Sequence, residues 1–168
     1  MNEKIQNELK GPKEWVEIFP YGLTLALNSR EPLFLFKDHS EKYVLPIHLD
    51  QHEAELALHC FRKNNSTETS MELPKSLLKR VGMNFKRAII NEVAGHHQYM
   101  VLEIEFNGVK FEERVRADHG LSICLRMDCP FYTTVGHVRK MREVQSDVER
   151  NAWAKPVVDS INNPNYLN

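Results

Sequence analysis

The sequence predicts an α+β fold with a mixed or mainly antiparallel sheet, about three core helices and an internal duplication of structure. Strand-like segments form groups and do not alternate strictly with helices, as they would in a doubly wound sheet. Twice, near Asp50 and near Asp118, a strand pattern passes directly into an apolar helix pattern. An Asn107-Gly108 pair, typical of two-residue hairpin turns, joins two strands antiparallel. With 168 residues, 42% of them hydrophobic, the chain is long enough to bury a core.

The first half of the chain predicts four strands and a helix. Alternating apolar residues indicate strands at 15–19, 24–27, 32–36 and 43–47, with turns at 20–22 and 28–30. Pro46 places the fourth strand at a sheet edge, because proline cannot donate a ladder hydrogen bond. A helix is expected from about Asp50, since Asp50 and Glu53 have the spacing of a capping box and an apolar face follows them.

The second half predicts a similar series. A short helix from Leu73 to Arg80 is closed by Gly82, and its buried side is expected to carry Leu77, Leu78 and Val81. The core helix of this half is expected at 118–127, where apolar residues fall at helical spacing. The strands are expected at 85–93, 98–106, 109–115 and 131–134.

Composition bounds the organisation of the chain. We expect a flexible arm at residues 1–13, one domain at 14–135 and a charged C-terminal extension at 136–168, which includes a helix around 138–153. No apolar run is long enough to span a bilayer and no secretory signal is visible, so we expect no membrane association and a cytoplasmic location. The three cysteines have no zinc-site spacing and are expected to be buried thiols.

The charge balance restricts nucleic-acid binding. The formal net charge is −1, whereas nonspecific binding to nucleic acid depends on phosphate neutralisation by Lys and Arg. Any such site must therefore be a local basic patch. Lys79, Arg80, Lys86 and Arg87 are one candidate group, and a second consists of His137, Arg139, Lys140 and Arg142. Groups of this size usually form a solvated face, but the two could combine into one patch.

Two motifs resemble the bifunctional nuclease (BFN) family. Leu45-Pro46-Ile47 followed by Glu53-Ala54 is similar to the family block L-P-I-x-I-G-x-x-E-A, with Asp50 at the glycine position. The stretch from Arg116 to Leu121 stands where the family has R-P-S-D-A-I, but Ala117, Asp118 and His119 occupy the Pro, Ser and Asp positions. The chain therefore resembles a divergent member over roughly residues 16–134.

The resemblance implies a compact α+β domain, a nuclease acting on DNA or RNA, and a homo-oligomer. We expect Mg²⁺ or Mn²⁺ as the metal, since phosphodiester hydrolysis commonly uses hard cations held by carboxylates, and no organic cofactor. The roles expected from the two turns are catalysis by Glu53, Asp118 and His119, substrate binding by Arg116 and His52, and metal binding by Asp50 and Asp118.

Structural explanations compete with each role. Asp50 is explained by helix capping, and Asp118 could cap the second helix by accepting the amide of residue 120 or 121. Arg116 could anchor Asp118 instead of binding phosphate, and His96 and His97 are expected to be exposed at a hairpin tip. The alternative function is a noncatalytic binding or regulatory module, or an oligomeric scaffold.

Overall fold

The computed structural model describes residues 14–26, 30–62 and 71–144, with side chains through Met141. The expected arm at 1–13 lies outside these residues. So do residues 145–168 of the expected extension and the end of the predicted strand at 24–27.

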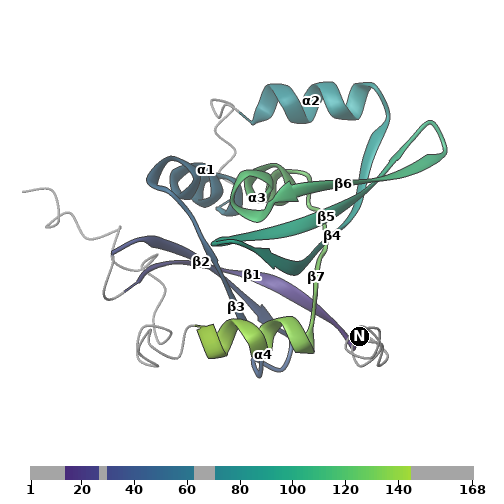
Figure 1. Cartoon of the computed structure of the whole chain (residues 1–168). Helices are drawn as coiled ribbons and strands as arrows, with labels where there is room; N and C mark the ends of the chain where they lie inside the picture. The colour runs from purple at the N-terminus through teal and green to yellow at the C-terminus, as the bar shows by residue number, and fades with distance from the viewer. Residues whose placement is uncertain (1–13, 27–29, 63–70, 145–168) are drawn as a thin grey trace, which may run out of the picture.

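The described residues form a mixed seven-stranded sheet and four helices (Figure 1). The strands are β1 (Trp15–Leu25), β2 (Pro32–Asp38), β3 (Val44–His48), β4 (Met83–Ala94), β5 (His97–Phe106), β6 (Val109–Arg116) and β7 (Phe131–Thr134). The helices are α1 (Gln51–Phe61), α2 (Glu72–Arg80), α3 (Ala117–Arg126) and α4 (Val135–Val144). The predicted α+β class and the mainly antiparallel sheet are confirmed. No helix in the described ranges is long and apolar enough to cross a bilayer.

The sheet contains the same arrangement twice. Its strand order is β3-β2-β1-β7-β4-β5-β6, and all neighbours are antiparallel except β4 and β7. Three successive antiparallel strands lead into α1, and three more lead into α3. We call these the first and second meander units. The positive φ angles of Asn107 and Gly108 close the β5–β6 hairpin, as the sequence predicts.

One long strand replaces two predicted ones. The turn predicted at 20–22 lies inside β1, where the pairing with β2 shifts register between Pro20 and Gly22. The pairing of β1 with β7 covers only Trp15 to Ile18, so Pro20 lies beyond it and needs no hydrogen-bond partner on that side. A β-bulge therefore absorbs the residues that the sequence pattern assigns to a turn.

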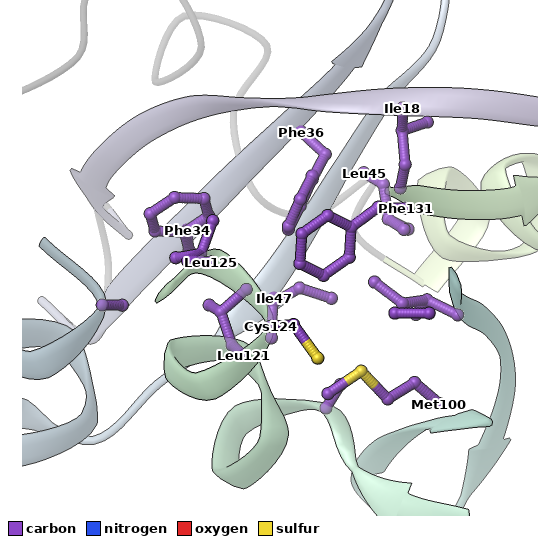
Figure 2. Close-up of a cluster of buried hydrophobic side chains, with 14 of the residues drawn as sticks. Ile18, Phe34, Phe36, Leu45, Ile47, Met100, Leu121, Cys124, Leu125 and Phe131 are labelled. Atoms are coloured by element: carbon purple, nitrogen blue, oxygen red, sulfur yellow. The ribbon is translucent and has the colours of Figure 1, made fainter. Parts of the chain in front are cut away.

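The main core lies between the sheet and the helices α1 and α3. Figure 2 shows side chains from both meander units meeting there, including Phe34 and Phe36 from β2, Met100 from β5 and Leu121 from α3. Figure 1 shows α1 and α3 next to each other on one side of the sheet, and the two helices are in contact. All three cysteines are buried free thiols, as expected.

Helix α2 is peripheral, contrary to the sequence prediction. None of its residues is buried, and Leu77 and Val81, assigned to its buried side, are each 52% exposed. The helix contacts the sheet mainly at β4, and an ion pair between Glu72 and Arg126 joins it to α3. Leu77 and Val81 therefore face solvent, and Leu78 is only half-buried.

Helix α4 follows β7 directly and begins earlier than predicted. It packs against β3 and β7, and Val138 and Met141 are buried. His137 is also buried, and burial together with the charge of Lys140 lowers its pKa to about 4. This position next to β3 and β7 brings α4 into the wall of a cavity described below.

Candidate functional site

The structure brings the two helix starts together. The pKa of the Glu53 carboxyl responds to the charges of Asp50, His52, Asp118 and His119. The charge of Asp50 also acts on Arg116. The predicted catalytic, substrate-binding and metal-binding residues therefore share one electrostatic environment, which we call the helix-start site: Asp50, His52, Glu53, Arg116, Asp118 and His119.

The two helices contribute residues from matching positions. Asp50 is the N-cap of α1 and Arg116 is the N-cap of α3. Counting from the caps, Glu53 and His119 both occupy the third helical position. The exposed amides at both helix starts carry partial positive charge, which favours anions nearby. The site thus combines an acidic residue and an imidazole at equivalent places in the two meander units.

Asp50 is held by helix capping, as the spacing predicts. Its Oδ1 accepts the backbone N–H of Glu53 at 2.8 Å, and the cap residue is extended, with φ −76° and ψ 172°. One carboxylate oxygen therefore already stabilises α1.

Asp118 does not cap α3, so that alternative is wrong. Asp118 lies inside the first turn of α3. The Arg116 side chain binds both of its oxygens: Nε of Arg116 donates to Oδ1 at 3.1 Å, and Nη2 of Arg116 donates to Oδ2. The backbone N–H of His119 also donates to Oδ1 at 3.0 Å. Burial opposes ionisation of Asp118, but these hydrogen bonds and the charges of Arg116 and His119 lower its pKa below the usual value. The expectation that Arg116 could anchor Asp118 is confirmed.

The pKa of Glu53 is shifted in the opposite direction, upward. Partial burial raises the pKa of its carboxyl, the negative charge of Asp50 raises it further, and His119 and His52 partly offset both. The side chain of His119 is 56% exposed. The site thus contains a carboxyl with a raised pKa beside an accessible imidazole, a combination suited to proton transfer.

The residues at this site do not form a ready metal-binding cluster. Across the described ranges, no group of three or more His, Cys, Asp or Glu side chains is placed to hold a metal ion. Both oxygens of Asp118 accept hydrogen bonds from the Arg116 side chain, and one oxygen of Asp50 accepts a hydrogen bond from the backbone N–H of Glu53. The metal role expected for Asp50 and Asp118 therefore does not fit their present contacts, and we assign no chemical step to Mg²⁺ or Mn²⁺.

A cavity of about 170 Å³ adjoins the helix-start site and shares Asp118 with it. We call it the hairpin cavity, because the β4–β5 hairpin forms one wall and the end of β3 and α4 form the others. Its lining residues are Ile47, His48, Val93, Gly95, His96, His97, Gln98, Asp118, Lys140 and Met141.

The sequence alone does not reveal this cavity. His96 and His97 are exposed at the hairpin tip, as expected, but they also line the cavity. The adjacent histidines at 96 and 97 are the available signal in the sequence, and only the fold adds His48 to them. Gln98 carries no local signal, and Lys140 is marked only as one of the basic residues at 137–142; the packing of α4 near the hairpin brings the two into one cavity.

Two members of the basic group at residues 79–87, Lys86 and Arg87, are paired with carboxylates. Lys86 lies 3.4 Å from Glu105, and Arg87 lies 2.6 Å from Glu103 on the neighbouring strand. This surface therefore fits a solvated face of paired charges better than a phosphate-binding patch.

Comparison with models of known protein families found no match, and comparison with curated proteins found none either. The BFN resemblance accordingly rests on the sequence motifs alone, which besides the two blocks include weaker matches at 73–78 and 125–131.

Proposed function

We propose that this chain is a BFN-like nuclease that cleaves phosphodiester bonds at the helix-start site. The observation that carries the proposal is that Glu53, whose pKa is raised, lies within range of the charge of His119, whose imidazole is exposed. A base and an acid on opposite sides of a phosphate are the minimum that phosphodiester cleavage by proton transfer requires.

The proposed mechanism uses Glu53 as general base and His119 as general acid. Glu53 takes the proton of the attacking hydroxyl as its oxygen bonds to phosphorus. Protonated His119 then donates a proton to the leaving oxygen as the other phosphorus–oxygen bond breaks. RNA supplies its own attacking group in the 2′-hydroxyl, so this route favours RNA over DNA, where a water molecule must be activated.

The remaining residues would bind and orient the phosphate. Arg116 has five N–H donors and can contact a phosphate oxygen while remaining paired with Asp118. His52 is exposed on the first turn of α1 and lies within charge range of Glu53. Asp118 acts as a positioning residue in this scheme, because its carboxylate fixes the Arg116 side chain.

A noncatalytic binding module is the second candidate. It is favoured by the engagement of Asp118 with Arg116 and by the lack of a metal-ligand cluster among the described residues. In this case the same site would recognise a ligand without cleaving it.

Cleavage assays with matched variants separate the two candidates. Labelled single-stranded RNA and DNA would be incubated with purified protein in EDTA, in Mg²⁺ and in Mn²⁺. We expect Glu53→Gln and His119→Ala each to lower the RNA cleavage rate about 100-fold or more, as for loss of a general acid or base. Glu55→Gln is the matched control, since Glu55 is exposed on the same helix.

Equal cleavage by the wild type and all three variants would identify a contaminating nuclease and contradict the proposal. Cleavage that depends strictly on Mg²⁺ or Mn²⁺ but not on Glu53 would replace the proton-transfer mechanism with a metal-dependent one. Oligonucleotide binding without cleavage under any condition would support the binding module.

We also propose that the chain forms a homo-oligomer. Exposed apolar residues on α2 and an exposed edge strand, β6, support this. Sedimentation showing only monomer at micromolar concentration would contradict it. The cytoplasmic location stays a prediction from the sequence.

A further inference from the structure

The two edges of the sheet differ in how they are covered. Strand β3 forms one edge, where Pro46 lacks a backbone N–H, most residues are buried and α4 packs against the strand. Strand β6 forms the other edge, and its residues 109–114 are all exposed. An uncovered edge strand presents N–H and C=O groups that can pair with a further strand. Within the described part of the chain, β6 is therefore the edge that is open to another chain.

The β5–β6 hairpin determines which backbone groups of β6 point outward. Its two-residue turn pairs Phe106 with Val109, and turns of this kind carry a hydrogen bond between the flanking residues. Because hydrogen-bonded pairs alternate along an antiparallel ladder, Phe111 also directs its N–H and C=O toward β5. Lys110 and Glu112 direct theirs to the free edge. A strand added to β6 would bond to these two residues.

Apolar surface continues to the same edge. Phe85 on β4, Ile104 on β5 and Phe111 on β6 are paired in one row across the second meander unit. Ile104 belongs to the main core and Phe85 packs against it, whereas Phe111 is 40% exposed. Val109, which shares the face of Phe111, is 65% exposed. The apolar row therefore ends uncovered at β6.

The sequence of β6 restricts how a second copy could pair with it. Two antiparallel copies related by a two-fold axis place one residue of β6 directly opposite its own copy. A charged residue at the axis would face its own like charge, which is unfavourable. This excludes Lys110, Glu112, Glu113, Arg114 and Arg116.

The apolar residues of β6 leave one register. Val109 at the axis would leave almost no ladder, because the turn precedes it directly. Val115 at the axis would set Arg114 against Arg116. Phe111 at the axis allows residues 109–113 of the two copies to pair and joins the two apolar rows.

With Phe111 at the axis, the neighbouring charges are complementary. Lys110 of each copy faces Glu112 of the other, and these are the residues whose backbone groups point to the free edge. Arg114, already bound to a carboxylate of β4 in its own chain, would face Gly108, which has no side chain. Charges on an edge strand commonly prevent pairing. Here they oppose the other registers and favour this one.

We propose that β6 pairs antiparallel with β6 of a second copy of this chain, with Phe111 at the two-fold axis and Lys110 opposite Glu112, so that two seven-stranded sheets join into one. This inference rests on the homo-oligomer proposed above and specifies its interface. The same register brings the β5–β6 turn of the second copy beside the end of β6, directly before Arg116 of the helix-start site. A loop of one copy therefore adjoins the candidate site of the other.

Exchange of charges across the axis tests the register. Sedimentation equilibrium would measure dimerisation, for which we expect a dissociation constant on the order of micromolar because the ladder is short. Lys110→Glu and Glu112→Lys should each weaken the dimer about tenfold, since each replaces two attractive pairs with two repulsive ones. The double variant restores both pairs and should dimerise like the wild type. Lys79→Glu, the same charge change at an exposed residue of α2, is the matched control and should have no effect.

A cysteine at the axis tests the geometry. The two copies of residue 111 would form a pair without mutual hydrogen bonds, whose Cα atoms lie about 4.5 Å apart, within the range of a disulfide. Phe111→Cys should therefore give covalent dimers under mild oxidation. Lys110→Cys should not, because its two copies are offset by two positions along the ladder. The native cysteines are buried, so each variant has a single exposed thiol among the described residues.

The outcomes separate this interface from oligomer formation in general. Only monomer at about 100 micromolar, with no covalent dimer from Phe111→Cys, would contradict both. A dimer that withstands both single charge changes, or that Leu77→Glu on α2 abolishes while they do not, would overturn this interface and leave the homo-oligomer in place. A double variant that stays monomeric while folded would overturn the register.

Discussion

The starts of α1 and α3 occupy equivalent places in the two meander units, yet different interactions hold them. At α1 the N-cap side chain of Asp50 accepts a backbone N–H of the first turn. At α3 the N-cap residue, Arg116, makes no capping bond and instead binds the side chain of Asp118. One start is stabilised by a local backbone contact and the other by an ion pair.

This difference gives the site its two kinds of carboxyl. At α1 partial burial raises the pKa of Glu53, and the negative charge of Asp50 raises it further. At α3 the Arg116 contacts overcome burial and lower the pKa of Asp118. Repeating one topology therefore does not repeat the chemistry, because burial is the main influence on the pKa of Glu53, whereas hydrogen bonds and positive charge outweigh burial at Asp118.

The packing of the two helices also differs at the fourth helical position, directly after Glu53 in α1 and His119 in α3. Ala54 in α1 and Gly120 in α3 both occupy the fourth helical position and both are buried. A Cβ atom on Gly120 would clash with Met100 Cε and would lie 2.9 Å from Val115 Cγ2. The start of α3 therefore sits closer to the strands of its own unit than a larger residue allows.

Gly120→Val should have the largest effect. The added side chain overpacks the contact with Met100 and Val115, and we expect a loss of about 3 kcal/mol, or roughly 10 °C in Tm. Ala54→Gly, the matched change at α1, should cost only about 1 kcal/mol. Thermal and urea unfolding measure both. A loss at Gly120 no larger than that at Ala54 would show that the two helix starts pack alike.

Asp50→Ala should have an intermediate effect. It removes the capping bond to Glu53, and we expect a loss of about 1 kcal/mol in the free energy of unfolding. Asp50→Ser should keep most of the stability, because serine also caps helices. Arg116→Ala removes no capping bond at α3. If Ser and Ala were equally destabilising at position 50, capping would not be the role of Asp50.

The smallest effects should appear in the pH dependence of stability, with opposite signs at the two starts. Because its folded pKa is lowered, Asp118 contributes stability above its unfolded pKa near 3.8, and that stability is lost as the pH falls through the lower folded value. Because its folded pKa is raised, Glu53 reduces stability as the pH rises from 4.5 through its folded value.

Asp118→Asn should therefore destabilise the protein at pH 7, and Glu53→Gln should stabilise it slightly. Urea unfolding between pH 3 and pH 7 measures both changes. Changes of the same sign would mean that the two carboxyls share one environment and that the contrast between the helix starts is absent.

Several features could be predicted because their causes are local. The capping spacing of Asp50 and Glu53 marks the start of α1, Asn107-Gly108 marks a hairpin, and Pro46 marks an edge strand. The predicted helix at α2 is confirmed, but its predicted buried side and the turn predicted inside β1 were wrong for a common reason. In the sequence, Pro20 and Gly22 have the pattern of a turn, and Leu77 and Val81 have the pattern of a buried helix face. Only the neighbouring strands and helices show that the first pair lies in a strand and the second pair faces solvent.

The sequence by itself determined where the strands meet the helices and which polar residues stand at those junctions, since caps, turns and apolar periodicity act within a few residues. Only the tertiary structure decided that the two junctions lie together, that Arg116 binds Asp118, and that Gln98 and Lys140 line one cavity. Those outcomes depend on how a seven-stranded sheet places residues distant in sequence, and on the balance between burial and nearby charges that shifts the pKa of each carboxyl.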